Sequence, residues 1–301
     1  MCLCSPSLLA AEKRIAFTFD DAPRSDLSYF FQPEERTIKL VAALRDADID
    51  QAGFFIRASF LRDESDFHRI DLYADAGHVI ANHSYRHNRL RNMTAEDYLA
   101  DIDRAEEELR PFLNRRPWFR FPYLDEGDVA EKHDAVHAGL RDRGLVNGYV
   151  TVDNFDWYLD RLAADADAAG QCMDRQALQQ IYVDMIVESA AFYDQLAIKH
   201  YGRSPAHILL LHENDIAAEF LPALAARFRE EGWEIISADD AYADPIASLK
   251  PRTLVNNQGR VSAIAHALGA DLSALEHAHE NEQYLDALFA ERVIQSCDGD
   301  Q

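Results

Sequence analysis

Short apolar runs alternate with amphipathic segments over most of this 301-residue chain. The apolar runs predict buried strands, which we expect at residues 15–19, 52–57, 79–81, 118–121, 148–152, 207–211 and 233–236. Helical spacing between them predicts helices at residues 34–46, 94–112, 129–143, 174–200 and 216–231. Strands that alternate with helices pair in parallel through right-handed crossovers. We therefore predict an α/β fold, a barrel of about seven parallel strands that is complete or one strand short, with an open doubly wound sheet as the alternative.

The alternation ends near residue 247. Residues 248–301 contain two helix-like pieces, 261–268 and 282–294, and no clear strand. We expect a barrel domain over residues 12–247 and a helical C-terminal appendix over residues 248–301 that packs on it. No apolar run reaches the length of about 18 residues that crosses a bilayer, so we expect no integral membrane segment.

The chain is strongly acidic, because 53 Asp and Glu against 30 Lys and Arg give a formal net charge of −23. Nucleic acids and anionic membranes repel such a charge, so we expect neither as a partner. A polyanionic substrate is disfavoured as well, unless basic residues gather locally. No glycine-rich phosphate loop occurs in the sequence, so a nucleotide cofactor is not indicated. Nothing in the sequence indicates an oligomeric state.

The cysteines and the N-terminus bear on the cellular compartment. Cys2, Cys4, Cys172 and Cys297 form no C-x-x-C pair and are too sparse for a disulfide scaffold, so we expect isolated thiols. The segment "SLLAA" looks like the end of a signal peptide cleaved after Ala11, although its apolar region is short and a basic start is missing. We expect an exported protein, periplasmic or extracellular, with an incomplete signal, and a cytoplasmic location as the alternative.

Polar side chains that can do chemistry follow the expected strands where each strand ends. They are Asp20 and Asp21 after the first strand, His83 and His87 after the third, Arg120, Pro122 and Tyr123 after the fourth, Asp153 and Asp156 after the fifth, and His212 after the sixth. Barrels and open α/β sheets build their sites at the carboxyl ends of parallel strands. We therefore expect these side chains to converge.

The spacing of the histidines suggests a metal site. His83 and His87 are four residues apart, so on a helical turn they would share one face. Two imidazoles and one carboxylate can hold a metal ion and leave positions open for water and substrate. His133 and His137 have the same spacing, but they fall on an expected helix, and we expect a solvated helix face there.

Each of these residues also has a purely structural interpretation. Asp20 and Asp21 could start a turn, His212 could be a satisfied core histidine, and Arg120 could be an ordinary ion-pair partner. Asp156 could be a surface acid beside the buried aromatic Trp157. These alternatives together are weaker than the functional reading, because all the residues fall at strand ends on one face.

Five ordered stretches, "TFDDA", "HSYRH", "RFPY", "DNFDW" and "LLLH", resemble the motifs of the polysaccharide deacetylases, the NodB-homology group of carbohydrate esterase family four. The resemblance covers about residues 14–245 and implies a distorted (β/α) barrel. It also implies a metal-dependent hydrolase that removes N- or O-acetyl groups from an acetylated carbohydrate, either a polymer or an oligosaccharide.

The resemblance implies a role for each motif residue. Asp21, His83 and His87 would hold a divalent metal, usually zinc, although cobalt, nickel and manganese suit the same ligands. Asp20 would be the general base, oriented by Arg120. His212 would be the general acid, tuned by Asp156. The backbone N–H of Tyr123 would complete the oxyanion site, and Trp157 and Leu210 would line the pocket for the acetyl methyl group. A carboxylate partner favours the imidazolium of a histidine, and a neighbouring arginine favours an ionised carboxylate.

The sequence departs from the family pattern at two loops and one insertion. Ala22 stands where the family commonly has glycine, and the arginine motif reaches a glycine only at Gly127. The long segment between Asp156 and His212 could reshape the substrate groove. Two alternatives therefore stay open, a metal-dependent amidohydrolase acting on a non-sugar C–N bond and a non-catalytic carbohydrate-binding protein.

Overall fold

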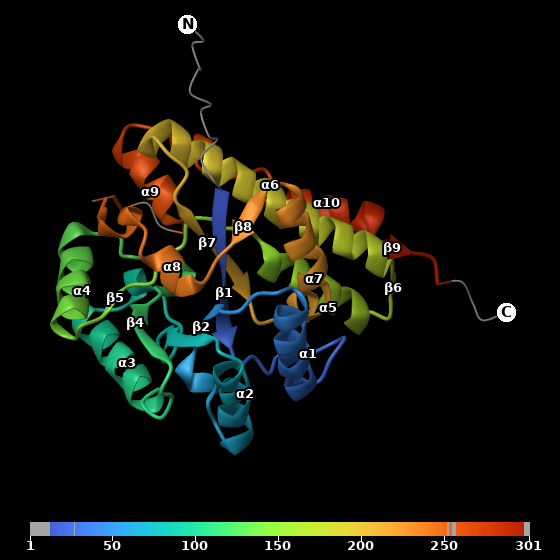
Figure 1. Cartoon of the computed structure of the whole chain (residues 1–301), viewed down its shortest axis with the longest axis horizontal. Helices are drawn as coiled ribbons and strands as arrows, with labels where there is room; N and C mark the ends of the chain where they lie inside the picture. The colour runs from blue at the N-terminus through green and yellow to red at the C-terminus, as the bar shows by residue number, and fades with distance from the viewer. Residues whose placement is uncertain (1–12, 27, 252, 255–256, 298–301) are drawn as a thin grey trace, which may run out of the picture.

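A single parallel sheet forms the centre of the fold. The structure is a computed structural model, and it describes residues 13–26, 28–251, 253–254 and 257–297. The sheet has seven strands in the order β5-β4-β3-β2-β1-β7, with β8 also paired to β1. Helices surround it, as Figure 1 shows. The predicted α/β class with about seven parallel strands is confirmed.

The strands are short, and most end near the expected positions. The sheet contains β1 (Lys13–Ala22), β2 (Gly53–Ile56), β3 (Val79–Asn82), β4 (Arg115–Phe119), β5 (Val146–Asn147), β7 (Ala206–His212) and β8 (Trp233–Ile235). A separate antiparallel pair consists of β6 (Cys172–Met173) and β9 (Ile294–Gln295), which the sequence pattern did not indicate.

The α-helices include all those expected from the sequence. They are α1 (Pro33–Asp46), α2 (Glu64–Asp75), α3 (Ala95–Glu108), α4 (Ala130–Asp142), α5 (Asp156–Ala168), α6 (Arg175–Tyr201), α7 (Asp215–Glu230), α8 (Ala238–Tyr242), α9 (Arg260–Ala267) and α10 (Glu282–Arg292). Short 3₁₀ helices lie at Ala58–Phe60, Leu90–Asn92, Pro122–Leu124, Pro245–Ser248 and Leu272–Ala274. Sequence reasoning missed α2, α5 and α8.

β1 is the centre of the sheet. It pairs with β7 along most of its length, while β8 and β2 pair with its first and second halves. Ile15, Phe17 and Phe19 on one face and Ala16 and Thr18 on the other are fully buried, as is typical of a parallel strand covered on both faces. Phe17 meets Phe228 of α7 edge-on, and Phe19 stacks on a β2 ring. The apolar run after Arg14 therefore forms the strand that the sequence predicts.

The sheet closes irregularly between β5 and β7. Regular pairing of β5 stops at Asn147, and the chain rejoins the sheet at Val152, which bridges Leu209 of β7. Gly148 lies between these two points and packs closely on Phe55, because a Cβ there would lie 2.5 Å from that ring. The expected strand over residues 148–152 is thus reduced to one bridge, and the barrel is distorted at this point.

The C-terminal segment returns to the insertion between β5 and β7. β9 pairs with β6, and Cys297 forms a disulfide with Cys172, so the prediction of isolated thiols is wrong for these two cysteines. The two lie 125 residues apart in sequence, and only the folded path of the chain brings them together. Cys2, Cys4 and the predicted signal fall outside the described residues. The division into domains at residue 247 stays a prediction.

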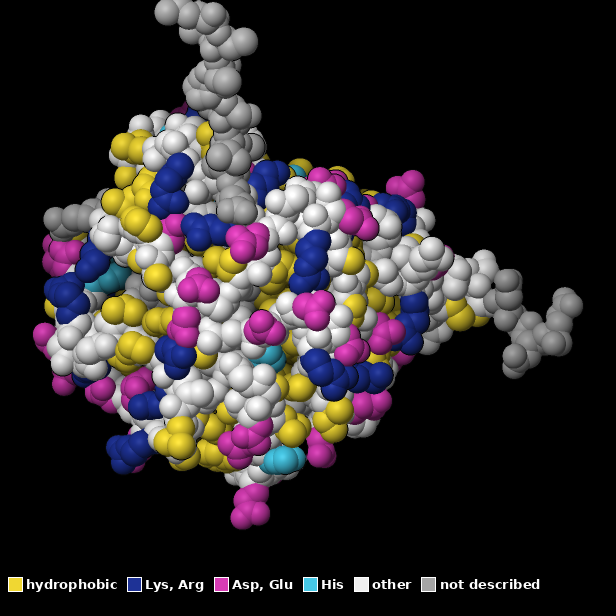
Figure 2. Space-filling view, in the orientation of Figure 1, with side chains coloured by type: hydrophobic (Ala, Val, Ile, Leu, Met, Phe, Trp, Pro, Cys, Tyr) yellow, Lys and Arg dark blue, Asp and Glu magenta, His cyan; other side chains and the backbone are white. Residues whose placement is uncertain are grey.

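Figure 2 shows how charged side chains are distributed on one face of the molecule. On the face drawn in Figure 2, acidic and basic side chains are interspersed and no continuous field of one sign forms. Among the described residues, no helix combines the length and apolarity needed to cross a membrane.

Candidate active site

The carboxyl ends of β1, β3, β4 and β7 meet at one pocket. Its volume is about 520 Å³, and its lining includes the predicted site residues Asp20, Asp21, His83, His87, Tyr123, Trp157, Leu210 and His212. The remaining two, Arg120 and Asp156, are fully buried and contact Asp20 and His212 from behind. The structure therefore brings all the predicted site residues together.

The end of β1 brings two adjacent carboxylates to the same pocket. The register with β2 shifts between Asp20 and Ala22, and Asp21 has a φ of 65°. This bulge breaks the alternation that would send neighbouring side chains to opposite faces. Ala22 lies outside the set of positive-φ residues, so the backbone there does not require a glycine.

The two histidines after β3 converge through a loop. The Nε2 atoms of His83 and His87 lie 3.1 Å apart. Ser84 and His87 have φ values of 67° and 59°, so the predicted helical turn is wrong. The Oγ of Ser84 accepts the backbone N–H of His87 at 2.9 Å, and the Asn82 side chain accepts that of Ser84 at 2.7 Å. These bonds fix the loop that aims both rings at Asp21.

Asp21, His83 and His87 fit a divalent cation. The Asp21 Oδ1 atom is buried without a hydrogen-bond partner and lies 3.3 Å from His87 Nε2 and 4.0 Å from His83 Nε2. The Nδ1 of His83 bonds the carbonyl oxygen of Arg120 at 3.0 Å, which leaves its Nε2 for a ligand. An orphaned carboxylate oxygen facing two imidazoles is the donor set expected for zinc or a similar ion.

Burial and charge set the protonation of these three groups. Burial lowers the pKa of His83 and of His87 to about 4, so both rings are neutral at neutral pH, the form that binds metals. Burial opposes the charge of Asp21, but the neighbouring histidines outweigh it and hold the pKa of its carboxyl below the ordinary value.

Asp20 is held by a fully buried arginine. The Arg120 Nη1 donates to Asp20 Oδ1 at 2.5 Å, its Nε donates to the Gly148 carbonyl at 2.8 Å, and its Nη2 donates to the Tyr242 hydroxyl at 2.9 Å. The guanidinium also lies 3.7 Å over the ring of Phe55. Burial nevertheless raises the pKa of Asp20, and Arg120 offsets only part of that effect.

His212 is held by a fully buried carboxylate. Its Nδ1 lies 2.7 Å from Asp156 Oδ1, and its backbone N–H donates to Asp156 Oδ2 at 2.8 Å. Asn214 donates to the same Oδ2 at 3.0 Å. Burial opposes a charge on His212, but Asp156 prevails and raises the pKa of the imidazole to about 9. His212 therefore carries a proton at neutral pH.

Tyr123 forms part of the pocket rim. It lies in the 3₁₀ helix Pro122–Leu124 with a φ of 58°, and its ring is 4.6 Å from that of His87. The Arg89 guanidinium lies over the Tyr123 ring, 3.9 Å from its centroid. The loop after β4 thus places an aromatic group beside the histidine cluster.

Several residues in and behind the pocket were not found from the sequence. Arg57 directly follows β2, so the rule of strand ends could have found it. Tyr242 of α8, which supports Arg120, has no such signal. Asn257 and Glu282, which we call the C-terminal wall, come from the segment after residue 248 and line the same pocket. Only the tertiary fold reveals their position.

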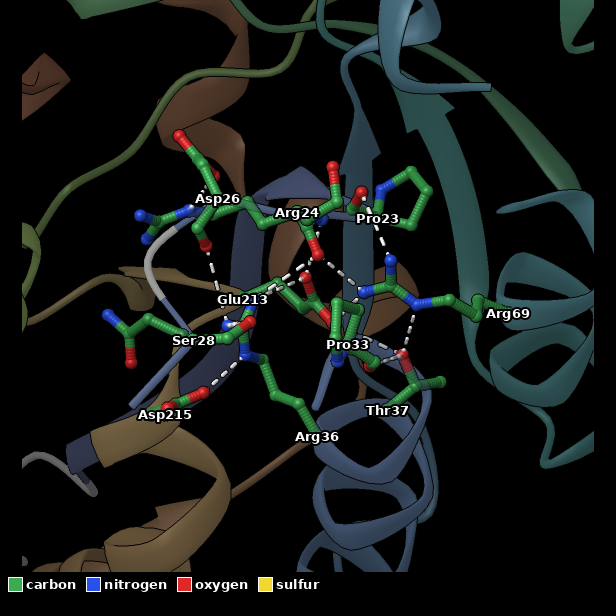
Figure 3. A network of polar contacts seen from close by, with 12 residues as sticks. Pro23, Arg24, Asp26, Ser28, Pro33, Arg36, Thr37, Arg69, Glu213 and Asp215 are labelled. Carbon is green, nitrogen blue, oxygen red and sulfur yellow. Dashed lines mark hydrogen bonds and ion pairs between the residues drawn. The ribbon is translucent and has the colours of Figure 1, made fainter. Parts of the chain in front are cut away.

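A buried polar network adjoins the pocket at Arg24 (Figure 3). Glu213, next to His212, accepts bonds from the Arg24 backbone N–H at 2.6 Å, from Arg69 at 2.9 Å and from the Tyr73 hydroxyl at 3.0 Å. Arg36 donates to Asp215 at 2.5 Å. We call these groups the Glu213 network. It ties the ends of β1 and β7 to α1 and α2.

Sequence comparison adds a family assignment to this geometry. Residues 10–141 match the model of the polysaccharide deacetylases. The matched part is 132 of the 301 residues, so the chain is similar to the polysaccharide deacetylases over somewhat less than half of its length. The resemblance inferred from the motifs is confirmed there, and the match includes the motifs of Asp20, His83 and Arg120. The motifs of Asp156 and His212 lie beyond it.

One curated relative supports the same assignment. A peptidoglycan-N-acetylglucosamine deacetylase of Bacillus cereus is 30% identical over 118 residues, which are 39% of this chain and 38% of the relative. The chain therefore matches well under half of that deacetylase.

Solved structures of polysaccharide deacetylases and related proteins share the fold. A deacetylase solved with substrate covers 77% of this chain and 92% of its own, with 19% identity and a TM-score of 0.51. A peptidoglycan N-acetylglucosamine deacetylase in complex with an N-oxidanyl-benzamide covers 76% and 87%, with 17% identity and a TM-score of 0.52. A family four pseudoenzyme from Bacillus anthracis covers 76% and 65%, with 15% identity and a TM-score of 0.53. Because a pseudoenzyme shares this fold, activity has to be argued from the site residues.

Proposed function

We propose that the protein is a metal-dependent deacetylase that hydrolyses acetyl groups on a sugar polymer or oligosaccharide. One observation carries the proposal. A single pocket joins a carboxylate held by an arginine, a histidine held by a carboxylate, and the metal-binding set of Asp21, His83 and His87. This combination supplies a base, an acid and a cation site for amide or ester hydrolysis.

Each side chain has a chemical task in the proposed reaction. Asp20, aligned by Arg120, accepts the proton of the attacking water. His212, protonated at neutral pH, donates a proton to the leaving amine or alcohol. The backbone N–H of Tyr123 stabilises the negative charge that develops on the acyl oxygen. A divalent cation at Asp21, His83 and His87 would polarise that oxygen and make water more acidic.

We propose N-acetylglucosamine in a glycan as the substrate class. The names of the Bacillus cereus relative and of one structural neighbour support this, since both are peptidoglycan-N-acetylglucosamine deacetylases. Trp157 and Phe155 line the pocket, and aromatic faces suit the apolar faces of sugar rings. We also propose export, because the Cys172–Cys297 disulfide is typical of proteins in oxidising compartments.

Acetate release tests the proposal. Metal-depleted protein is assayed on acetylated chito-oligomers, peptidoglycan and acetylated xylan before and after zinc is added. We expect activity only with metal, and Asp20→Asn should lower it by about 10²–10⁴-fold while zinc stays bound. Asp46→Asn, an exposed acid on α1, is the control and should keep full activity. Full activity of the chelated protein on these glycans would refute the proposal.

A small non-sugar amide is the second candidate. The C-terminal wall adds Asn257 and Glu282 to the pocket lining, and a wall of this kind favours a short substrate over a long polymer. The same assay with small amides separates the two candidates. Saturable glycan binding without any hydrolysis would instead favour the non-catalytic alternative.

A further inference from the structure

A second group of imidazoles and a carboxylate lies away from the active site. His133 and His137 are one turn apart on α4, and Glu126 lies in the turn that precedes this helix. Only 14% of the His133 side chain, 20% of His137 and 33% of Glu126 are exposed. The prediction of a solvated helix face is therefore wrong for this pair.

The three side chains converge on one point. Glu126 Oε2 lies 2.8 Å from His137 Nε2 and 3.9 Å from His133 Nε2. Tetrahedral zinc with bonds of 2.0–2.1 Å keeps its ligand atoms roughly 3.4 Å apart. Side-chain shifts of about half an ångström would thus bring both Glu126–imidazole distances to this value.

Glu126 Oε1 and His133 Nδ1, the atoms that would not bind the metal, already have partners. Asn147 donates to Glu126 Oε1 at 2.8 Å, and His133 Nδ1 lies 3.1 Å from Asp134 Oδ1. Metal-binding histidines commonly give their second N–H to a carboxylate, which fixes the tautomer and the ring orientation. The cluster therefore has the outer contacts of a metal site as well as its ligands.

The backbone holds Glu126 in place. Gly127 has a φ of 107°, and a Cβ there would lie 3.4 Å from the backbone nitrogen of His133, so glycine lets the turn approach α4. Asp125 accepts the Gly127 N–H at 3.1 Å and the Arg91 Nε at 2.8 Å. The carboxylate is presented to the helix by a fixed turn.

The cluster faces a second cavity of about 770 Å³, whose lining also includes Arg141, Lys250 and Arg260. We propose that Glu126, His133 and His137 bind a second divalent metal ion of the zinc type, with one coordination position open to this cavity. The basic lining suits water or an anion as the fourth ligand. Glu126 lies three residues after Tyr123, so such an ion would also brace the loop at the active-site rim. This inference does not depend on the proposed function.

A third group, Glu188, His277 and His279, is a weaker candidate and serves as an internal control. Its carboxylate is 58% exposed, and Glu188 Oε2 lies 3.7 Å from His279 Nδ1. An exposed carboxylate loses more side-chain freedom and stays more hydrated, so it is a poorer ligand than Glu126.

Zinc content tests the second site. Metal-depleted full-length protein is equilibrated with buffered zinc and analysed by mass spectrometry of the metal. We expect about two ions per chain for the wild type, about one for His133→Ala and for His83→Ala, and none for the double variant. His279→Ala should keep both ions. Equal zinc content in His133→Ala and wild type, or loss of an ion in His279→Ala alone, would overturn the proposal.

Thermal unfolding gives a second readout. Zinc that binds only the folded chain raises its Tm, so zinc should stabilise His83→Ala but not the double variant His83→Ala/His133→Ala. If His133→Ala does not fold, Glu126→Gln replaces it with the same expectation. Stabilisation of the double variant to the same extent as His83→Ala would contradict the second site.

Discussion

Asp20 and Asp21 are neighbours in sequence and both approach His83 Nε2, at 3.4 and 4.0 Å, but their other partners differ. Arg120 contacts Asp20 at 2.5 Å, whereas Asp21 faces two imidazoles and has an oxygen without a hydrogen-bond partner. Burying two adjacent carboxylates is costly unless cations compensate them. Arg120 compensates one, and the proposed metal compensates the other.

The contact between Asp156 and His212 allows a prediction about how activity depends on pH. Asp156 raises the pKa of His212 to about 9 against the effect of burial, so a general acid here stays protonated until the pH rises through that value. Asp156→Asn removes the carboxylate charge, and burial then lowers the pKa. We expect the alkaline limb of the kcat/KM profile to shift to lower pH.

The control for this prediction is Asp165→Asn, an exposed acid on the same helix. A bound cation near His212 would lower the pKa in every variant, so the informative quantity is the difference between the two profiles. Identical alkaline limbs in both variants would show that Asp156 does not tune His212.

At the scale of elements, the Glu213 network joins β1, β7, α1 and α2. Glu213 and the guanidinium groups of Arg36 and Arg69 are almost fully buried, and Arg36 and Arg69 also bond the carbonyl oxygen of Arg24. The strand ends that carry Asp21 and His212 are thus held by the same buried charges. The geometry of the pocket depends on helices that do not line it.

Replacement of Glu213 should therefore lower the free energy of unfolding. Glu213→Gln leaves Arg36 and Arg69 buried without their shared carboxylate, and such losses cost about 3–5 kcal/mol. Urea denaturation measures the change. Glu219→Gln, which breaks a half-exposed ion pair with Arg175 on the neighbouring helix, should cost at most about 1 kcal/mol. Similar losses in the two variants would argue against the network as an anchor.

At the scale of the whole molecule, the C-terminal segment is part of the pocket. It supplies the C-terminal wall, and α9 and α10 lie beside α6 in Figure 1. The Cys172–Cys297 disulfide fastens the end of this segment to the insertion after β5. Segments from both ends of the chain therefore form one site.

Loss of the disulfide should destabilise the fold. Closing a loop of this length stabilises a protein by about 2–4 kcal/mol, chiefly by restricting the unfolded chain. We expect Cys172→Ser, Cys297→Ser and the double variant to lower Tm by similar amounts in differential scanning calorimetry. A reducing agent should lower the Tm of the wild type but leave that of the double variant unchanged. Equal Tm values for the oxidised wild type and the double variant would contradict a stabilising role of the disulfide.

The sequence predicts some features of this molecule better than others, for physical reasons. The alternating pattern predicts β1 and its parallel partners because buried parallel strands are continuously apolar. The strand-end rule places Asp20, His83 and His212 on one face. The loop that joins His83 to His87 depends on positive φ values that these residue types rarely adopt, so no pattern indicates it.

Long-range pairings were also beyond the sequence. Cys172 and Cys297, 125 residues apart, meet only because β9 returns to β6. Such contacts depend on the fold as a whole, and local spacing carries no trace of them.

The fastening of the C-terminal wall has a practical consequence for producing the protein. In a reducing host cytoplasm the barrel and the metal ligands would form as usual, but Cys297 would stay a thiol and the wall would lack its covalent tether. Preparations from reducing and oxidising hosts would then share a sheet and differ in the pocket. Any property of the pocket measured on the two preparations, such as affinity for a ligand, would then differ although their sequence is the same.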